Sequence, residues 1–261
     1  MKKVLVVVSF GTTFPETREK DLEAVENALQ NVFVDRDFYR AYTSKIVMKR
    51  LLEDDGIKVS DLNTVLQELK DKGYEDVLVQ MTHLLMGEEY SKKIMTIIHD
   101  FKDSFKKFNV GRPLLADDFD HSLTVAALAT ELPELLPDEA VVFVGHGSPN
   151  IHNPSYNLLE KRLQAYGIPA VIGVVEENDH PNYEDMLKAL KKLNVKKVLL
   201  VPLLLVCGDH AHNDIAGEES DSWSSLLKAE GYDVSVNISG MGRNKAIQNI
   251  FVMHALAAVA H

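Results

Sequence analysis

The stretch KKVLLVPLLLVCGDHAHND, residues 196–214, joins an unbroken apolar run to a dense polar cluster. The run from Val198 to Val206 is short, follows two lysines and stops before Gly208. It predicts a buried strand of a parallel sheet that is covered on both faces. In open α/β sheets, ligands bind beyond the carboxyl ends of the strands. The histidines that follow, His210 and His212, therefore stand where an α/β protein carries its chemistry.

Two further apolar runs in the same half of the chain end in residue types that can act as metal ligands. Residues 141–144 lead into Gly-His-Gly with His146 at its centre, and residues 170–175 lead into Glu176. Because the strands of a parallel sheet end at the same edge, we expect His146, a glutamate at 176 or 177, and His210 to converge. Two imidazoles and one carboxylate with open positions form a site for a divalent transition metal.

Each of these residues also has a simpler interpretation. The glycines around His146 fit a tight turn with an anion at its amides, which needs no imidazole. Glu176 and Glu177 fit solvated residues after a strand, although alternation would point the two in opposite directions and Glu176 comes first. Of His210 and His212, we expect one to be a ligand and the other to lie beside the site or at the surface.

Composition restricts the class of protein. The chain has 261 residues, of which 46% are hydrophobic and 26% charged, as in ordinary globular domains. A net charge of −11 without a basic block argues against nucleic-acid binding. Cys207 is the single cysteine, so no intrachain disulfide forms. No apolar run is long enough to span a membrane, and the first run leads into Ser9 without a cleavage site, so we expect a cytoplasmic protein.

Strand patterns alternate with helical ones along the whole chain, which predicts an α/β fold. We expect two similar Rossmann-like domains, each a parallel four-stranded sheet flanked by helices, with a cleft between them. The first domain spans 1–133, the second spans 134–243, and the C-terminal helix 244–261 packs back on the first. The expected strands are 4–9, 37–42, 76–82, 110–115, 141–145, 170–175, 197–206 and 234–238.

The two halves also align with each other. Residues 77–89 match 198–210 without a gap, which places Glu89 opposite His210. Residues 8–12 match 144–148 in the same way. This indicates a duplicated βαβ unit. Metal ligands would then line one wall of the cleft, and Ser9, Phe10, Thr12 and Glu89 the other.

The order and spacing of these motifs resemble the anaerobic cobalt chelatases, the sirohydrochlorin cobaltochelatases of vitamin B12 synthesis, which are ATP-independent chelatases related to ferrochelatase. The resemblance covers essentially the whole chain. It is carried by Val8-Ser9-Phe10-Gly11-Thr12, Asp35-Arg36-Asp37, Arg40-Ala41-Tyr42-Thr43-Ser44, Gly87-Glu88-Glu89-Tyr90, Gly145-His146-Gly147, Val175-Glu176, Gly208-Asp209-His210-Ala211, Asn213-Asp214 and Asp221-Ser222-Trp223. The chain departs from the family pattern after Glu176, where the loop is longer, and at His212.

The resemblance implies insertion of Co²⁺, as substrate metal, into sirohydrochlorin without an organic cofactor. It implies His146, Glu176 and His210 as metal ligands. We further expect His146 to accept one pyrrole proton and Glu89 to take the second. The loop of Ser9, Phe10, Gly11, Thr12 and Thr13 is expected to bind the substrate. The carboxylates of the substrate are expected to bind Arg18, Arg40, Lys45 and Arg243.

Other functions stay open at this point. An iron or nickel chelatase would use the same ligands, because Co²⁺, Fe²⁺ and Ni²⁺ accept similar donors. A metal or tetrapyrrole carrier would bind without turnover. A hydrolase with His146 near Ser148 lacks the Gly-x-Ser-x-Gly elbow. His83 is consistent with a histidine packed in the core. The sequence is also compatible with a homo-oligomer.

Overall fold

The computed structural model describes residues 1–147, 154–209 and 211–260, and it divides into two compact units. The first unit combines Met1–Ala116 with Gly242–His261, and the second is Asp117–Met241. The division falls earlier than residue 133, where the sequence suggested it. The helix α6 (Asp118–Ala129) belongs to the second unit because it pairs with α7 (Ser155–Ala165). Arg162 on α7 forms an ion pair with Asp118 and donates to the Ser122 hydroxyl at 3.0 Å.

The sheet of the first unit has the strand order β2-β1-β3-β4-β9. The four longer strands are parallel, as expected, and a short antiparallel strand extends the sheet at β4. Val4 on β1 lies beside Asp37 on one side and Val77 on the other. The strands are β1 (Lys3–Ser9), β2 (Asp37–Tyr42), β3 (Asp76–Met81), β4 (Lys107–Val110) and β9 (Val259–Ala260).

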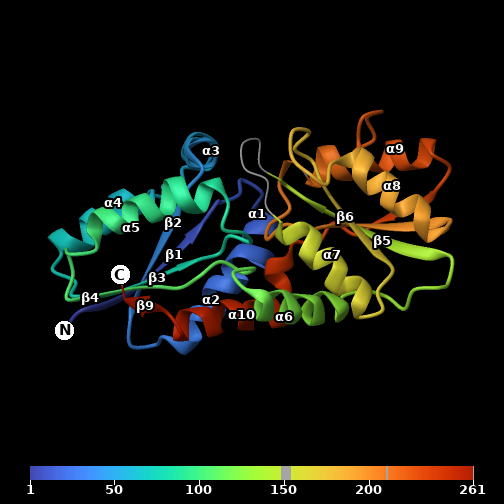
Figure 1. Ribbon diagram of the computed structural model, residues 1–261. Coiled ribbons are helices and arrows are strands. Elements are labelled where there is room, and N and C mark those ends of the chain that lie inside the picture. Colours follow the sequence, from blue (N-terminus) through green and yellow to red (C-terminus); the bar gives the residue numbers. More distant parts are fainter. Residues whose placement is uncertain (148–153, 210, 261) are drawn as a thin grey trace. The chain divides into compact units, whose positions relative to one another are not determined.

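Helices cover both faces of this sheet, which explains why the central run from Val4 to Val8 is apolar at every position (Figure 1). On one face, α4 and α5 pack on the even-numbered residues of β1. On the other face, α10 packs against α2. The helical segments are α1 (Pro15–Thr17), η1 (Arg18–Glu23), α2 (Ala24–Val32), α3 (Lys45–Asp55), α4 (Leu62–Asp71), η2 (Glu89–Met95), α5 (Thr96–Phe101), η4 (Met241–Arg243) and α10 (Lys245–Leu256).

The second unit has a purely parallel sheet in the order β6-β5-β7-β8. Its apolar core joins residues of β5, β6 and β7 to Met186, Trp223 and Leu227 on the covering helices. The elements besides α6 and α7 are β5 (Glu139–Gly145), β6 (Ala170–Val174), α8 (Tyr183–Leu193), β7 (Lys197–Pro202), η3 (Ala211–Ile215), α9 (Trp223–Ala229) and β8 (Asp233–Val236).

Two strands differ from the apolar runs that predicted them. β7 ends at Pro202, whose nitrogen has no hydrogen to donate, although the run continues to Val206. β4 is Lys107–Val110 and not 110–115, because the chain leaves the ladder after Gly111 donates to the Val79 carbonyl at 2.8 Å. Among the described helices, none combines the length and the apolar character that a membrane crossing requires.

Candidate metal site

His146 stands at the carboxyl end of β5, in a turn that two glycines make possible. A Cβ on Gly145 would lie 2.6 Å from the Tyr156 ring, and Gly147 has a φ of +82°. A Cβ on Gly147 would also lie 2.9 Å from the Cβ of Glu176. No other residue fits either position without moving its neighbours. The glycines thus bring the backbone of this turn against Tyr156 on α7 and against the end of β6.

The imidazole of His146 is exposed and is oriented by its own turn. Its Nδ1 lies 3.0 Å from the carbonyl oxygen of Gly147. A neutral ring that donates from Nδ1 to a carbonyl presents its lone pair at Nε2. That tautomer suits both a metal ligand and a proton acceptor.

Glu176 lies directly beside this turn, as the parallel arrangement of β5 and β6 predicts. Its amide donates to the His146 carbonyl at 3.0 Å, which continues the β5–β6 ladder beyond Val174. Its side chain is half-buried, whereas those of Glu177 and Asn178 are exposed. The structure therefore brings Glu176, and not Glu177, against the His146 turn.

The third expected ligand, His210, lies outside the described residues. On either side of it, Cys207 is buried, Asp209 is exposed, and the amide of His212 donates to the Gly208 carbonyl at 3.2 Å. Within residues 1–147, 154–209 and 211–260, no three histidine, cysteine or acidic side chains form a metal-binding group. Of the three expected ligands, His146 and Glu176 are the two that lie among the described residues.

The expected substrate loop of the first unit uses most of its polar side chains internally. Ser9 is buried and accepts a hydrogen bond from the Thr82 hydroxyl at 2.8 Å. Thr12 is buried and accepts from the Phe14 amide at 3.2 Å. Gly11 has a φ of +94° and packs on the Tyr42 ring. Phe10, at 47% exposure, is the prominent exposed side chain of this loop, and Thr13 is partly exposed.

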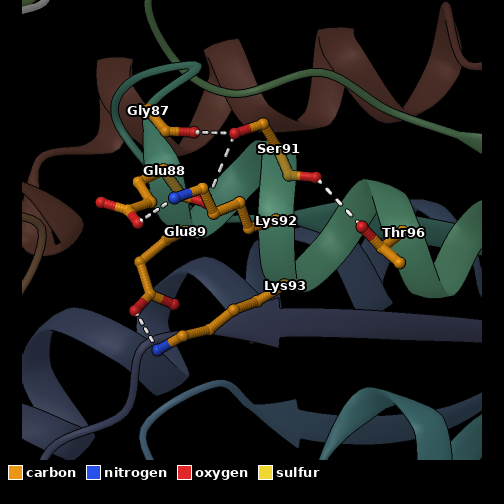
Figure 2. Close-up of polar contacts among 7 residues, drawn as sticks. All are labelled: Gly87, Glu88, Glu89, Ser91, Lys92, Lys93 and Thr96. Carbon is orange, nitrogen blue, oxygen red and sulfur yellow. Dashed lines mark hydrogen bonds and ion pairs between the residues drawn. The ribbon is translucent and has the colours of Figure 1, made fainter. Parts of the chain in front are cut away.

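Glu89 opens the π-helical segment η2 of the same unit (Figure 2). Its Oε1 forms an ion pair with Lys93, one position beyond the equivalent pair of Glu88 and Lys92. Its Oε2 is buried and has no hydrogen-bond partner among the described residues. Nearby, burial lowers the pKa of His83 to about 4, although the charge of Glu89 opposes that shift. His83 is therefore neutral at pH 7.

Two of the four expected carboxylate-binding cations already have acidic partners. Arg40 pairs with Glu26 and, at 3.0 Å, with Glu23, while Arg243 pairs with Asp21 at 2.6 Å. Lys45 is exposed. Arg18 differs, because its Nη1 is buried without a hydrogen-bond partner in the described part of the chain.

The hydroxyl of Tyr42 shares this property with Arg18. Burial raises the pKa of Tyr42 to about 12, and the charges of Arg40 and Arg18 act against that rise. In the sequence, Tyr42 stands in a motif of the resemblance but has no assigned role, and Tyr156 was not singled out; the hydroxyl of Tyr156 accepts from the Gly147 amide at 3.3 Å. Neither tyrosine belongs to a metal-binding pattern; the available signals were the position of Tyr42 at the end of a strand and that of Tyr156 after the Gly145–Gly147 turn.

Comparison with known proteins places these features in one family. The model of the family described as cobalt chelatase (CbiK) matches residues 3–260. A sirohydrochlorin cobaltochelatase of Salmonella typhimurium is 38% identical over 254 residues, which cover 97% of this chain and 95% of that protein. The sirohydrochlorin cobaltochelatase CbiKC of Nitratidesulfovibrio vulgaris is 31% identical over 264 residues, covering 99% of this chain and 91% of its own.

Solved structures agree in fold. SirB from Bacillus subtilis with Fe³⁺ has a TM-score of 0.65 at 17% identity, covering 98% of this chain and 95% of its own. The sirohydrochlorin chelatase SirB of Bacillus subtilis subspecies spizizenii, in complex with cobalt, has a TM-score of 0.64 at 14% identity, covering 98% and 94%. These structures show the fold, whereas the family model and the two cobaltochelatases match nearly the whole chain in sequence, and that match leads to one conclusion. The chain belongs to the cobalt chelatase (CbiK) family.

Proposed function

We propose that the protein is a sirohydrochlorin cobaltochelatase, which inserts Co²⁺ into sirohydrochlorin without ATP on the anaerobic route to cobalamin. One observation carries the proposal. His146 and Glu176 follow adjacent parallel strands at their carboxyl ends, and the Glu176 amide donates to the His146 carbonyl, in a member of the chelatase family. His210 completes the ligand set, and three protein ligands leave coordination positions open for ring nitrogens.

Insertion of a divalent ion requires the removal of two pyrrole protons. His146 takes the first: the pyrrole N–H bond breaks and an N–H bond forms at Nε2 of the imidazole as the metal passes to the ring. Glu89 takes the second on its carboxylate. Glu176 and His210 retain the ion until the macrocycle binds it. Chelation by four ring nitrogens supplies the driving force, so nucleotide hydrolysis is not needed.

The substrate's carboxylates are proposed to bind at Arg18 and at backbone amides of residues 10–13. Arg18 is favoured over Arg40 and Arg243 because their guanidinium groups already bind carboxylates of the protein. A carboxylate accepts hydrogen bonds but donates none, which matches the unpartnered Nη1 of Arg18. Phe10 offers an exposed aromatic face to the macrocycle.

An absorbance assay with sirohydrochlorin and Co²⁺ in the absence of ATP tests the proposal. Wild-type protein should convert the metal-free spectrum to the cobalt one at a rate proportional to enzyme concentration. A matched control is His212→Ala, which removes an exposed imidazole close to the same loop. A protein that binds the ring without accelerating insertion is a carrier, and that result would reject the enzymatic function. Parallel assays with Fe²⁺ and Ni²⁺ establish the preferred metal.

A further inference from the structure

Three loops of the first unit each expose one large apolar side chain. Phe10 follows β1, Ile46 lies in the first turn of α3 after β2, and Met86 follows β3. Their exposed fractions are 47%, 68% and 43%. Phe10 is the only exposed residue of 10–14, and Met86 is the only one of 82–88. Single exposed apolar residues are ordinary on a protein surface, whereas several at one place mark a binding surface.

The strands that precede these side chains are neighbours in the sheet. Their order is β2-β1-β3 and they are parallel, so their carboxyl ends lie at one edge. Hydrogen bonds join the loops that leave this edge: Ser44 donates to the Phe10 carbonyl at 3.3 Å, and Thr82 donates to the Val8 carbonyl at 2.8 Å. Because neighbouring strands lie about 4.8 Å apart, the three strand ends span about 10 Å, which is close to the width of a tetrapyrrole ring.

The second unit exposes polar residues at the equivalent edge. The first exposed residues after β5, β6 and β7, among those that the structure describes, are His146, Glu177 and Asp209. In the first unit the same comparison gives Phe10, Lys45 with Ile46 beside it, and Met86. The exposed apolar side chains are therefore a property of the first unit and not of the repeated fold.

Charge beside the apolar residues indicates what kind of molecule would cover them. Lys45 precedes Ile46 and is exposed, and no acidic side chain pairs with it in the described part of the chain. An apolar surface bordered by such a cation suits a ligand with apolar faces and a carboxylate-bearing edge. A tetrapyrrole with carboxylate side chains has both, because its conjugated faces are apolar and its charges lie on the periphery.

We propose that Phe10, Ile46 and Met86 form an apolar platform on which one face of the macrocycle packs, with Lys45 binding a carboxylate at the edge. This rests on the proposed function and adds Ile46 and Met86 to the residues that bind the substrate. An aromatic ring and a thioether both pack well on a conjugated face, and the contact removes apolar surface from water. A macrocycle held by one face keeps its other face free for the metal ion.

The test measures the dissociation constant of metal-free sirohydrochlorin by fluorescence titration, before any cobalt is added. Ile46→Ser and Met86→Ser should each raise this constant about tenfold, because an apolar contact is lost, and the loss should appear as a higher KM in the insertion assay. Lys45→Gln should also raise it, by a factor that shrinks at high salt. Met86→Leu keeps an apolar side chain and should bind as the wild type does.

Leu52→Ser is the matched control. Leu52 is 53% exposed on the same helix as Ile46, but it lies six residues further along α3, away from the strand ends. The substitution makes the same change from a branched apolar side chain to a hydroxyl. Its dissociation constant for sirohydrochlorin should equal that of the wild type.

Three results would overturn the platform. The first is wild-type affinity in Ile46→Ser, Met86→Ser or Lys45→Gln. The second is an equal loss in Leu52→Ser, which would mean that any polar substitution on α3 weakens binding. The third is a loss in Met86→Leu as large as that in Met86→Ser. Tight binding of sirohydrochlorin without cobalt insertion would instead reject the enzymatic function and leave the platform in place.

Discussion

The loops after the first and third strands of each unit share the same backbone hydrogen bonds but carry different side chains. After β1, Thr43 donates to the Ser9 carbonyl at 2.9 Å and Ser44 to that of Phe10 at 3.3 Å. After β5, Val175 donates to the Gly145 carbonyl and Glu176 to that of His146, both at 3.0 Å. Gly11 and Gly147 both have positive φ angles. Phe10 therefore corresponds to His146, and Ser44 corresponds to Glu176.

The correspondence extends to the loops after β3 and β7. Ser91 donates to the Gly87 carbonyl at 3.0 Å, and His212 donates to that of Gly208 at 3.2 Å. A π-helical segment follows each glycine. The fold therefore supplies the same positions twice. The first unit fills them with an aromatic ring, a helix cap and a carboxylate, and the second fills two of the described ones with potential metal ligands.

Alanine substitution of the corresponding residues His146 and Phe10 should give the largest difference in insertion rate between the units. His146→Ala removes both a proposed ligand and a proton acceptor, so we expect cobalt insertion to fall on the order of a thousandfold with the fold intact. Phe10→Ala removes only an exposed aromatic contact and should mainly raise KM. The measurement is initial insertion rate against sirohydrochlorin concentration. Equal losses in the two variants would contradict a specialised second unit.

His83 and Leu204 occupy equivalent positions, because the preceding residues Thr82 and Leu203 donate to the Val8 and Val144 carbonyls at 2.8 and 2.7 Å. Only the histidine titrates, so the stability of the first unit should depend on pH at this position. The pKa of His83 is lowered from 6.5 to about 4 in the folded protein, so the unfolded chain binds the additional proton below pH 6.5. The stability that comes from a neutral His83 is present above that pH and is lost as the pH falls toward 4. Linkage gives a loss of about 3 kcal/mol. Urea unfolding at pH 7 and pH 4 should show this loss in wild type relative to His83→Leu. Parallel pH curves for the two proteins would exclude it.

Substitutions of Glu176 and Ser44 should affect different properties, the first cobalt affinity and the second stability. Glu176→Gln removes a proposed anionic ligand, and we expect cobalt affinity to fall about tenfold to a hundredfold with stability nearly unchanged. Ser44 is the N-cap of α3, where its hydroxyl accepts from the Val47 amide, so Ser44→Ala should cost about 1 kcal/mol of stability. Its cobalt affinity should equal that of wild type. Cobalt titration and urea unfolding of both variants provide the check, and a Glu176→Gln protein with wild-type affinity would remove Glu176 from the ligand set.

The sequence was sufficient for the parts of the fold that depend on apolar periodicity. The strand 37–42 agrees with β2 at both ends, and the parallel order follows from the alternation of strands and helices. β9 was missed because Val259 and Ala260 are exposed and form no pattern. β4 was displaced because Leu114 and Leu115 are buried in a loop, where their amides bond to the His83 and Leu84 carbonyls. Burial alone does not distinguish a strand from a well-packed loop.

For the site, the sequence predicted which residues would be neighbours better than it predicted which side chains would be exposed. The backbones of His146 and Glu176 are hydrogen-bonded because parallel strands end at a common edge, a rule that needs no tertiary detail. Their role as ligands stays a prediction. Ser9 and Thr12 were expected to contact substrate, but their hydroxyls bond to Thr82 and to the Phe14 amide. Thr82 is distant in sequence from Ser9, so only the folded chain reveals that Ser9 is occupied.

Tyr156 provides the smallest and most local test of the difference between the turns. The Gly147 amide donates to the Tyr156 hydroxyl at 3.3 Å. Among the described residues, the Gly11 turn has no equivalent hydrogen bond to a tyrosine hydroxyl, and Gly11 packs on the ring of Tyr42 instead. Burial raises the pKa of Tyr156 to about 12, so this hydroxyl stays neutral in the working range. Tyr156→Phe should cost about 1 kcal/mol of stability and lower kcat several-fold, because the turn that orients His146 loosens. Tyr183→Phe makes the same change in the same unit at a buried hydroxyl that has no hydrogen-bond partner among the described residues, and it should be neutral in both measurements. If urea unfolding and insertion rates of the two variants coincide, the hydroxyl of Tyr156 does not position the His146 turn, and glycine packing alone accounts for its shape.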